Sequence, residues 1–158
     1  MEKLNAENAT SVAKPKKKKK GKGINYTSMK CPYCGATVTY KSADEIYKNN
    51  SKGMMLYVCS RYPACDAYVR THLGTRVPVG TMANGQLRRL RFEAHLEFNK
   101  LYESGMMSKD EAYRWLALIT YSPQTYAHIG NMGEYYCKVV IDESRKLYQT
   151  LSERRGSA

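Results

Sequence analysis

The spacing of hydrophobic and polar residues divides the chain into two regions of different character. Between about residues 28 and 73, apolar residues occur in short runs separated by polar turns, which is typical of β-strands. The segment 48–53 is polar and is expected to be a turn. We predict a hairpin-rich module with strands at residues 37–40, 54–58 and 67–70, and a weaker strand candidate at 45–47.

After residue 84 the hydrophobic period changes from two to between three and four, which indicates helices. Asn84 can cap a first helix, and Gly105 can end it. Ser108 and Glu111 form a capping box for a second helix, and a third is expected to begin at residues 131–134. Each helix has one apolar stripe, so we predict that the three pack on one another. The stripe of the first helix contains Leu87, Leu90, Ala94, Phe98, Leu101 and Tyr102.

Positive charge is concentrated at the N-terminus. The chain has 26 basic and 14 acidic residues, a formal net charge of +12, and residues 1–24 contain eight of the lysines and two of the glutamates. This segment has no hydrophobic period, and its consecutive lysines repel one another, so we expect it to be disordered. It either solubilises the protein or tethers it to nucleic acid. The consecutive lysines are Lys16, Lys17, Lys18, Lys19 and Lys20.

Four cysteines have the spacing of a zinc ribbon. Cys31 and Cys34 form a C-x2-C pair followed by Gly35, and Cys59 and Cys65 form a C-x5-C pair. The intervening 24 residues read as strand, turn and strand, which would bring the two pairs together. Zn²⁺ binds four thiolates in a tetrahedron, and a full set leaves no open position for substrate. We therefore expect one structural Zn²⁺.

Other roles for the cysteines are less favoured. Disulfides are uncommon in a reducing compartment, and a redox C-P-Y-C motif is expected at the start of a helix rather than before a strand. Cys137 stands alone on the apolar stripe of the third helix, so we interpret it as a buried core residue. His72 is the nearest spare ligand, but with four cysteines present we expect it to be structural or on the surface.

These observations predict an α+β fold in which a small four-cysteine zinc ribbon precedes a three-helix region. We predict a basic tail at residues 1–24, the ribbon at 25–74, a connector at 75–84 and the helical region at 85–158. With fewer than about 50 residues the ribbon needs the metal as a staple, because so short a segment cannot build an adequate core.

The two cysteine pairs resemble the four-cysteine zinc ribbons appended to type IA DNA topoisomerases. The shared features are KCPYCG at residues 30–35 and CSRYPAC at residues 59–65, since the second turn of those ribbons reads C-S-x-Y-P-x-C. The resemblance implies help in binding single-stranded DNA. It implies no catalysis, because the large catalytic domain of those enzymes has no counterpart here.

A longer resemblance, from residue 29 to about 141, is to a family of small phage and bacterial zinc-finger-containing proteins of unknown function. It rests on CDAYV at 65–69, GTMANGQLRRLR at 80–91, Ala94-His95, AYRWLA at 112–117 and HIG at 128–130. This implies a phage or prophage origin and a bacterial cytoplasm or phage-infected cell. The lysine run would serve as a nuclear signal only in a eukaryotic host. No run of 18 or more apolar residues occurs, so no transmembrane helix is expected. The lysine-rich first residues include no apolar core of the kind a secretory signal needs, so we expect no such signal.

Tyrosines and basic residues alternate through the ribbon, which suits a single-strand binder because rings stack on bases and cations contact phosphates. A small ribbon has little core, so Tyr40, Tyr57 or both are expected to be structural. We expect Tyr62 to be exposed for stacking. Arg88, Arg89 and Arg91 either extend a phosphate-binding surface or form the solvated face of the first helix, and we favour the solvated face. The candidate contacts are Arg61, Tyr62, Lys30, Tyr33 and the five consecutive lysines.

The favoured hypothesis is a non-enzymatic, zinc-stabilised nucleic-acid-binding protein that prefers DNA to RNA and single strands to duplexes. The alternative is an adaptor whose ribbon and helices bind a protein of the phage or host. An enzyme is disfavoured because the acidic pairs read as loop, helix-cap and helix-surface residues. Neither a membrane nor a small-molecule substrate is expected as a partner.

Overall fold

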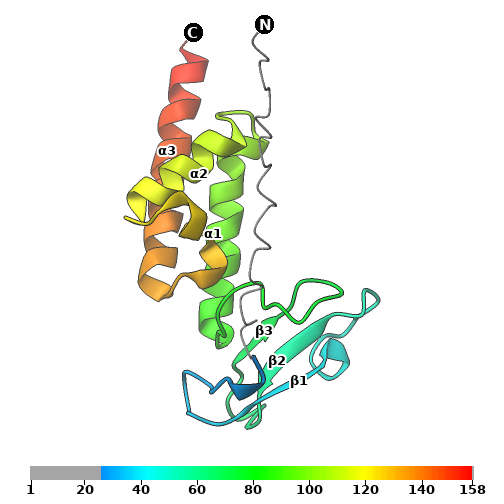
Figure 1. The fold of residues 1–158 in the computed structure, drawn as a ribbon. Helices are drawn as coiled ribbons and strands as arrows, with labels where there is room; N and C mark the ends of the chain where they lie inside the picture. Colours follow the sequence, from blue (N-terminus) through cyan, green and yellow to red (C-terminus); the bar gives the residue numbers. More distant parts are fainter. Residues whose placement is uncertain (1–25, 158) are drawn as a thin grey trace, which may run out of the picture.

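The computed structural model describes residues 26–157. A three-stranded antiparallel sheet is the main element of its first half (Figure 1). Its strands are β1 (Val38–Ser42), β2 (Met55–Cys59) and β3 (Tyr68–Arg70), in the order β1-β2-β3. The three main predicted strands are therefore confirmed. The predicted tail and its five consecutive lysines lie outside the described residues.

The weaker strand candidate at residues 45–47 is wrong. The chain forms a 3₁₀ turn, η2 (Ala43–Glu45), because the hydroxyl of Ser42 accepts a hydrogen bond from the amide of Asp44. Ile46 and Tyr47 then pack against a small buried cluster of Ala43, Leu56 and Val58. This segment covers one face of β2 and therefore needs apolar residues. In the sequence, those apolar residues resemble a short strand.

The other face of the sheet holds a second cluster around Tyr57. It contains Cys31, Val38, Tyr57, Cys59, Ala67, Val69 and Met82. Tyr57 is 1 % exposed, and its hydroxyl donates a hydrogen bond to the carbonyl of Arg76 at 2.9 Å. The prediction of a structural role is confirmed for this tyrosine. Both faces of the central strand are thus buried, although the sheet has only three strands.

Three helices follow the sheet, as predicted. They are α1 (Gly85–Glu103), α2 (Lys109–Ile119) and α3 (Glu134–Gly156). The side-chain oxygen of Asn84 accepts the Leu87 amide at 2.9 Å, and the expected capping box of Ser108 and Glu111 is present. Gly105 has a φ of 72°, the left-handed conformation that a glycine adopts without strain after a helix.

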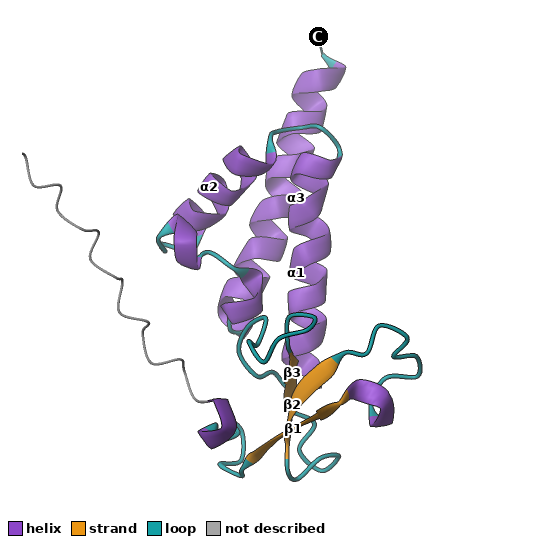
Figure 2. Cartoon of the chain, turned by 45° about the vertical axis from the view of Figure 1, so that its right-hand side comes forward, coloured by secondary structure: helices purple, strands orange, loops and turns teal. Residues whose placement is uncertain are grey.

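In Figure 2, α1 and α3 lie side by side, and the shorter α2 lies at an angle beside this pair and contacts both helices. Their shared core contains Phe98, Leu101, Leu116, Cys137 and Val140, all nearly or fully buried. On the surface, the guanidinium of Arg145 on α3 reaches the carboxylates of Glu93 and Glu97 on α1 at 2.7 and 3.3 Å. The α+β class, with a sheet followed by three packed helices, is confirmed.

The first turns of α1 stand on the sheet, and the segment before α1 pairs with β3 (Figure 1). Tyr68 and Ala83 exchange two backbone hydrogen bonds of 3.1 Å. Further along, the Thr81 amide donates to the carbonyl of Gly130, and a Cβ added to Gly80 would lie 2.1 Å from that oxygen. The residues between sheet and helix are therefore closely packed. None of the helices in the described part of the chain is both long and apolar enough to cross a membrane.

Candidate metal centre

Two tight turns bring the four cysteines together. In the first turn, the Gly35 amide donates to the carbonyl of Cys31 at 2.9 Å, with Gly35 at a φ of 70° that favours glycine. In the second, the amides of Tyr62 and Cys65 donate to the carbonyls of Cys59 and Arg61. The pairing of Val38 with Cys59 in the sheet then sets the two turns against each other.

The positions of the sulfur atoms fit a tetrahedral zinc ion. The Sγ atoms of Cys31 and Cys65 are 3.6 Å apart, those of Cys34 and Cys59 are 3.4 Å apart, and all four lie within 4.8 Å of one another. Zn–S bonds of about 2.3 Å in a tetrahedron place the sulfurs about 3.8 Å apart. A disulfide requires about 2.05 Å. The four cysteines are therefore positioned to hold one zinc ion, and the geometry does not fit disulfides.

Backbone amides and burial act on the thiols in opposite directions. The pKa of Cys34 is lowered to about 7, chiefly because the Ala36 amide donates to its sulfur. The pKa of Cys59 is raised to about 12, chiefly because this side chain is buried. A buried thiolate needs a compensating cation. Zinc would supply that charge for the buried ligands, Cys31 and Cys59, as well as for the two half-buried ones.

The donor set indicates a structural rather than a catalytic metal. Four thiolates complete the coordination of zinc and leave no position for water or substrate. Cys137 does not belong to this ligand set. It is fully buried in the helical core, and this burial raises the pKa of its thiol. His72 is exposed and is not among the residues whose ligand atoms cluster. Both predictions for these two residues are confirmed.

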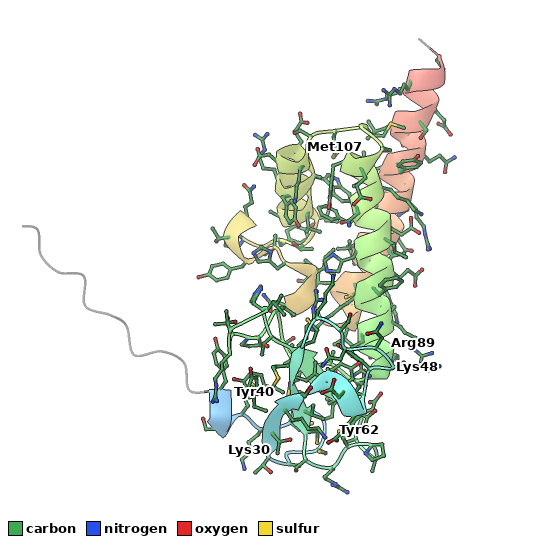
Figure 3. The ribbon with its side chains drawn as sticks, turned by 90° about the vertical axis from the view of Figure 1, so that its right-hand side faces the viewer. Lys30, Tyr40, Lys48, Tyr62, Arg89 and Met107 are labelled. Carbon is green, nitrogen blue, oxygen red and sulfur yellow. The ribbon has the colours of Figure 1, made fainter. Side chains whose placement is uncertain are left out.

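The predicted nucleic-acid contacts differ in their exposure. Lys30, Tyr33 and Arg61 flank the cysteines and are exposed, Tyr33 by 44 %. Tyr62 is only half-buried rather than free, because its ring packs against the cluster of Ala43, Leu56 and Val58. The expectation of an exposed Tyr62 is therefore wrong. Figure 3 shows Lys30 and Tyr62 at the end of the molecule opposite to Met107.

The interpretation of all three arginines on α1 as a solvated face is also wrong. Arg88 donates to the carbonyls of Asp66 and Ala83 at 2.7 and 2.6 Å. Arg91 donates to the carbonyls of Met132 and Thr81 at 2.9 and 2.7 Å. Only Arg89 is exposed.

A signal for Arg91 was present in the sequence. This residue lies four positions after Leu87 and three before Ala94, so it shares their buried face of the helix. An arginine at such a position must place its guanidinium against acceptors of a neighbouring element, here the loops that flank the sheet.

Comparison with known families gives one match. A family profile described as a zinc-finger-containing domain matches residues 27–147, which cover the sheet, the segment before α1, both shorter helices and over half of α3. Searches of curated proteins and of solved structures found no match. The family match and the sulfur geometry agree on a zinc-binding role for the first half of the chain.

Proposed function

The chain belongs to the family of zinc-finger-containing domains, and from this premise we propose that it is a non-enzymatic protein that binds single-stranded DNA. In this proposal the zinc ion holds the ribbon in shape, and the surface around the cysteines contacts the strand. The observation that carries the proposal is the placement of Lys30, Tyr33 and Arg61 as exposed side chains on the two turns that meet at the metal.

The exposed residues offer the two kinds of contact that a single strand needs. The ring of Tyr33 is free to stack on a base, a contact that is typically worth about 1–3 kcal/mol. Lys30 precedes Cys31 and Arg61 lies between Cys59 and Cys65, so both cations are near the same four sulfurs. A cation on each turn suits a phosphate backbone that passes over the metal end of the ribbon.

The remaining parts of the proposal rest on charge and resemblance. The lysines of residues 16–20 would add affinity that does not depend on base sequence, because they neutralise phosphates and release counterions. The preference for DNA and the phage or prophage setting rest on the two family resemblances. No enzymatic role is proposed, since the four thiolates saturate the metal.

A charge-matched pair of variants tests the proposal. Lys30→Gln/Arg61→Gln removes two charges at the metal end, whereas Lys48→Gln/Lys52→Gln removes two exposed charges from the η2–β2 loop at the other end of the hairpin. Fluorescence anisotropy with single-stranded DNA, duplex DNA and RNA should be recorded at several salt concentrations. Zinc content and thermal unfolding confirm that both variants are folded.

We expect the first variant to bind single-stranded DNA about tenfold more weakly and to lower the salt slope by about 1.4, at ~0.7 per lost phosphate contact. The second variant should leave the slope unchanged. Deleting residues 1–24 should also lower the slope. Equal effects of the two double variants would refute the metal end as the interface, and an intact protein that binds no nucleic acid at low salt would refute the function.

A second candidate function is the adaptor role, which one observation favours. Leu118, Tyr121 and Tyr135 on or beside α2 and α3 are 73 %, 93 % and 72 % exposed, and Tyr121 lines one hollow with Leu118 and a second with Tyr135. Exposed large hydrophobic side chains that gather in this way mark protein-binding surfaces. An adaptor should retain a specific protein partner after nuclease treatment and lose it in Leu118→Glu. Loss of all partners with the nucleic acid would count against this role.

A further inference from the structure

A groove lies where the sheet meets the helices. It consists of two adjoining hollows of about 400 and 640 Å³, each of a size typical of small-ligand sites. They share Arg70, Val79, Gly80, His95 and Gly130, and we call them together the junction groove. Its walls come from β3, the segment before α1, α1 itself and the loop before α3.

Four cationic or ionisable side chains line this groove and have no polar partner in the described part of the chain. Arg70 is the last residue of β3, and His72 lies two residues further along the chain. His95 lies on α1, and His128 lies in the loop before α3. Within the described residues, neither the guanidinium of Arg70 nor any of the three imidazoles makes a hydrogen bond or an ion pair. The three histidines are far apart in the sequence, and only the fold brings them to one place.

Among the residues that the structure describes, none that lines the groove carries a negative charge. Every titratable side chain that lines either hollow is an arginine, a histidine or a tyrosine. The pKa of His95 is lowered, first by burial of the ring and then by the positive charges of Arg70 and Arg91. A positive potential with unpartnered donors is the environment that binds a phosphate.

An exposed aromatic ring lies beside these donors. Phe92 is 66 % exposed, lines the smaller hollow and lies three residues before His95, on the same side of α1. It is not among the residues that pack against the helical core. A flat apolar ring next to cations matches the two parts of a nucleotide, because the ring can stack on the base while the cations bind the phosphate.

We propose that the junction groove binds one nucleotide of the single strand, with its phosphate at Arg70 and His95 and its base against Phe92. This inference rests on the proposed function and extends the interface from the metal end of the ribbon to the base of α1. Arg88 and Arg91 take no part in it, since their guanidinium groups already bind backbone carbonyls.

Two matched pairs of variants test the groove in the full-length, zinc-loaded protein. Arg70→Gln and Arg89→Gln each remove one exposed charge, but only Arg70 lines the groove. Phe92→Ala and Leu96→Ala each remove an exposed apolar side chain of α1, but only Phe92 lines it. With a single-stranded DNA oligonucleotide, we expect each groove variant to lose about tenfold in affinity and each control less than twofold.

Nuclear magnetic resonance provides a second measurement that reports on the groove itself. The oligonucleotide should raise the pKa of His95 towards or above that of a free imidazole, because a bound phosphate stabilises the imidazolium. The resonance is assigned with His95→Gln. Arg70→Gln should abolish this rise, whereas Arg89→Gln should leave it in place.

The outcomes separate this inference from the proposed function. If the intact protein binds DNA while the groove variants match their controls and the pKa of His95 is constant, the groove inference is wrong and the metal-end interface stands. If the intact protein binds no DNA, both are wrong. If a mononucleotide binds as tightly as the oligonucleotide, the groove is a site for a free nucleotide rather than for a strand, and the inference is overturned.

Discussion

Replacing Arg88 with methionine should lower the free energy of unfolding of the whole protein. Arg88 is a half-buried residue in the first turns of α1, next to the exposed Arg89. Methionine keeps much of the length and apolar volume of the side chain but removes every donor. The lost contacts are hydrogen bonds from Nη1 to the carbonyls of Asp66 and Ala83, at 2.7 and 2.6 Å, and a stacking contact over Tyr68 at 3.7 Å from the ring centre.

The magnitude follows from these contacts. A hydrogen bond from a charged group contributes about 1.5–3 kcal/mol, and the cation–π contact adds about 0.5–1 kcal/mol. The ion pair between Arg88 and Asp66 has an N–O distance of 3.3 Å. It adds little to stability, because the Asp66 side chain is 48 % exposed. The carbonyl of Ala83 keeps a bond from the Tyr68 amide, so one of the two acceptors stays satisfied. We expect a loss of about 3 kcal/mol in the free energy of unfolding, or roughly 10 °C in Tm.

Urea and thermal unfolding of the zinc-loaded protein, followed by circular dichroism, measure this loss. The adjacent Arg89→Met is the control, because Arg89 is exposed on the same helix and carries the same charge. Arg88→Lys should restore only part of the stability, since an ammonium group cannot bind two carbonyls and stack on a ring in the same way. If the Tm values of Arg88→Met and Arg89→Met differ by less than about 2 °C, the contacts of Arg88 do not stabilise the junction of sheet and helix.

Three further predictions concern the metal and the packing. Elemental analysis should find one zinc ion per chain in the intact protein and in Cys137→Ser, and none in Cys59→Ser. Acid should also release the metal, because protonated thiols do not bind zinc. Gly80→Ala should lower the free energy of unfolding by about 2 kcal/mol or more, since its Cβ would lie 2.1 Å from a carbonyl oxygen of the neighbouring loop, whereas Gly156→Ala, with open space around its Cβ, should not. Ser144→Ala should leave stability unchanged or raise it by up to about 1 kcal/mol, because this buried hydroxyl has no hydrogen-bond partner among the described residues; a clear loss of Tm would mean that the hydroxyl is bonded.

The elements that local chemistry determines were predictable. Asn84, Ser108 and Glu111 cap their helices through bonds that span three residues, so the sequence alone locates those ends. The spacing of Cys31, Cys34, Cys59 and Cys65 likewise predicts the metal site, because the ligand pairs lie on short turns. The strand prediction at residues 45–47 was wrong because Ser42 caps a 3₁₀ turn there. Ile46 and Tyr47 pack against the sheet from this turn, so the segment is as hydrophobic as a strand would be.

The sequence by itself thus determined the zinc ribbon, the order of strands and helices and the buried stripe of each helix. The ligand pairs lie on short turns with a recognisable spacing, and the strands and stripes follow from the hydrophobic period along the chain. Only the tertiary structure decided what the surface residues do. Packing across the sheet half-buries Tyr62. The guanidinium of Arg88 lies over Tyr68 of β3, and that of Arg91 binds the loops before α1 and α3. The same packing gathers Arg70 and three distant histidines around one groove. Such arrangements depend on how whole elements dock, which no local pattern in the sequence records.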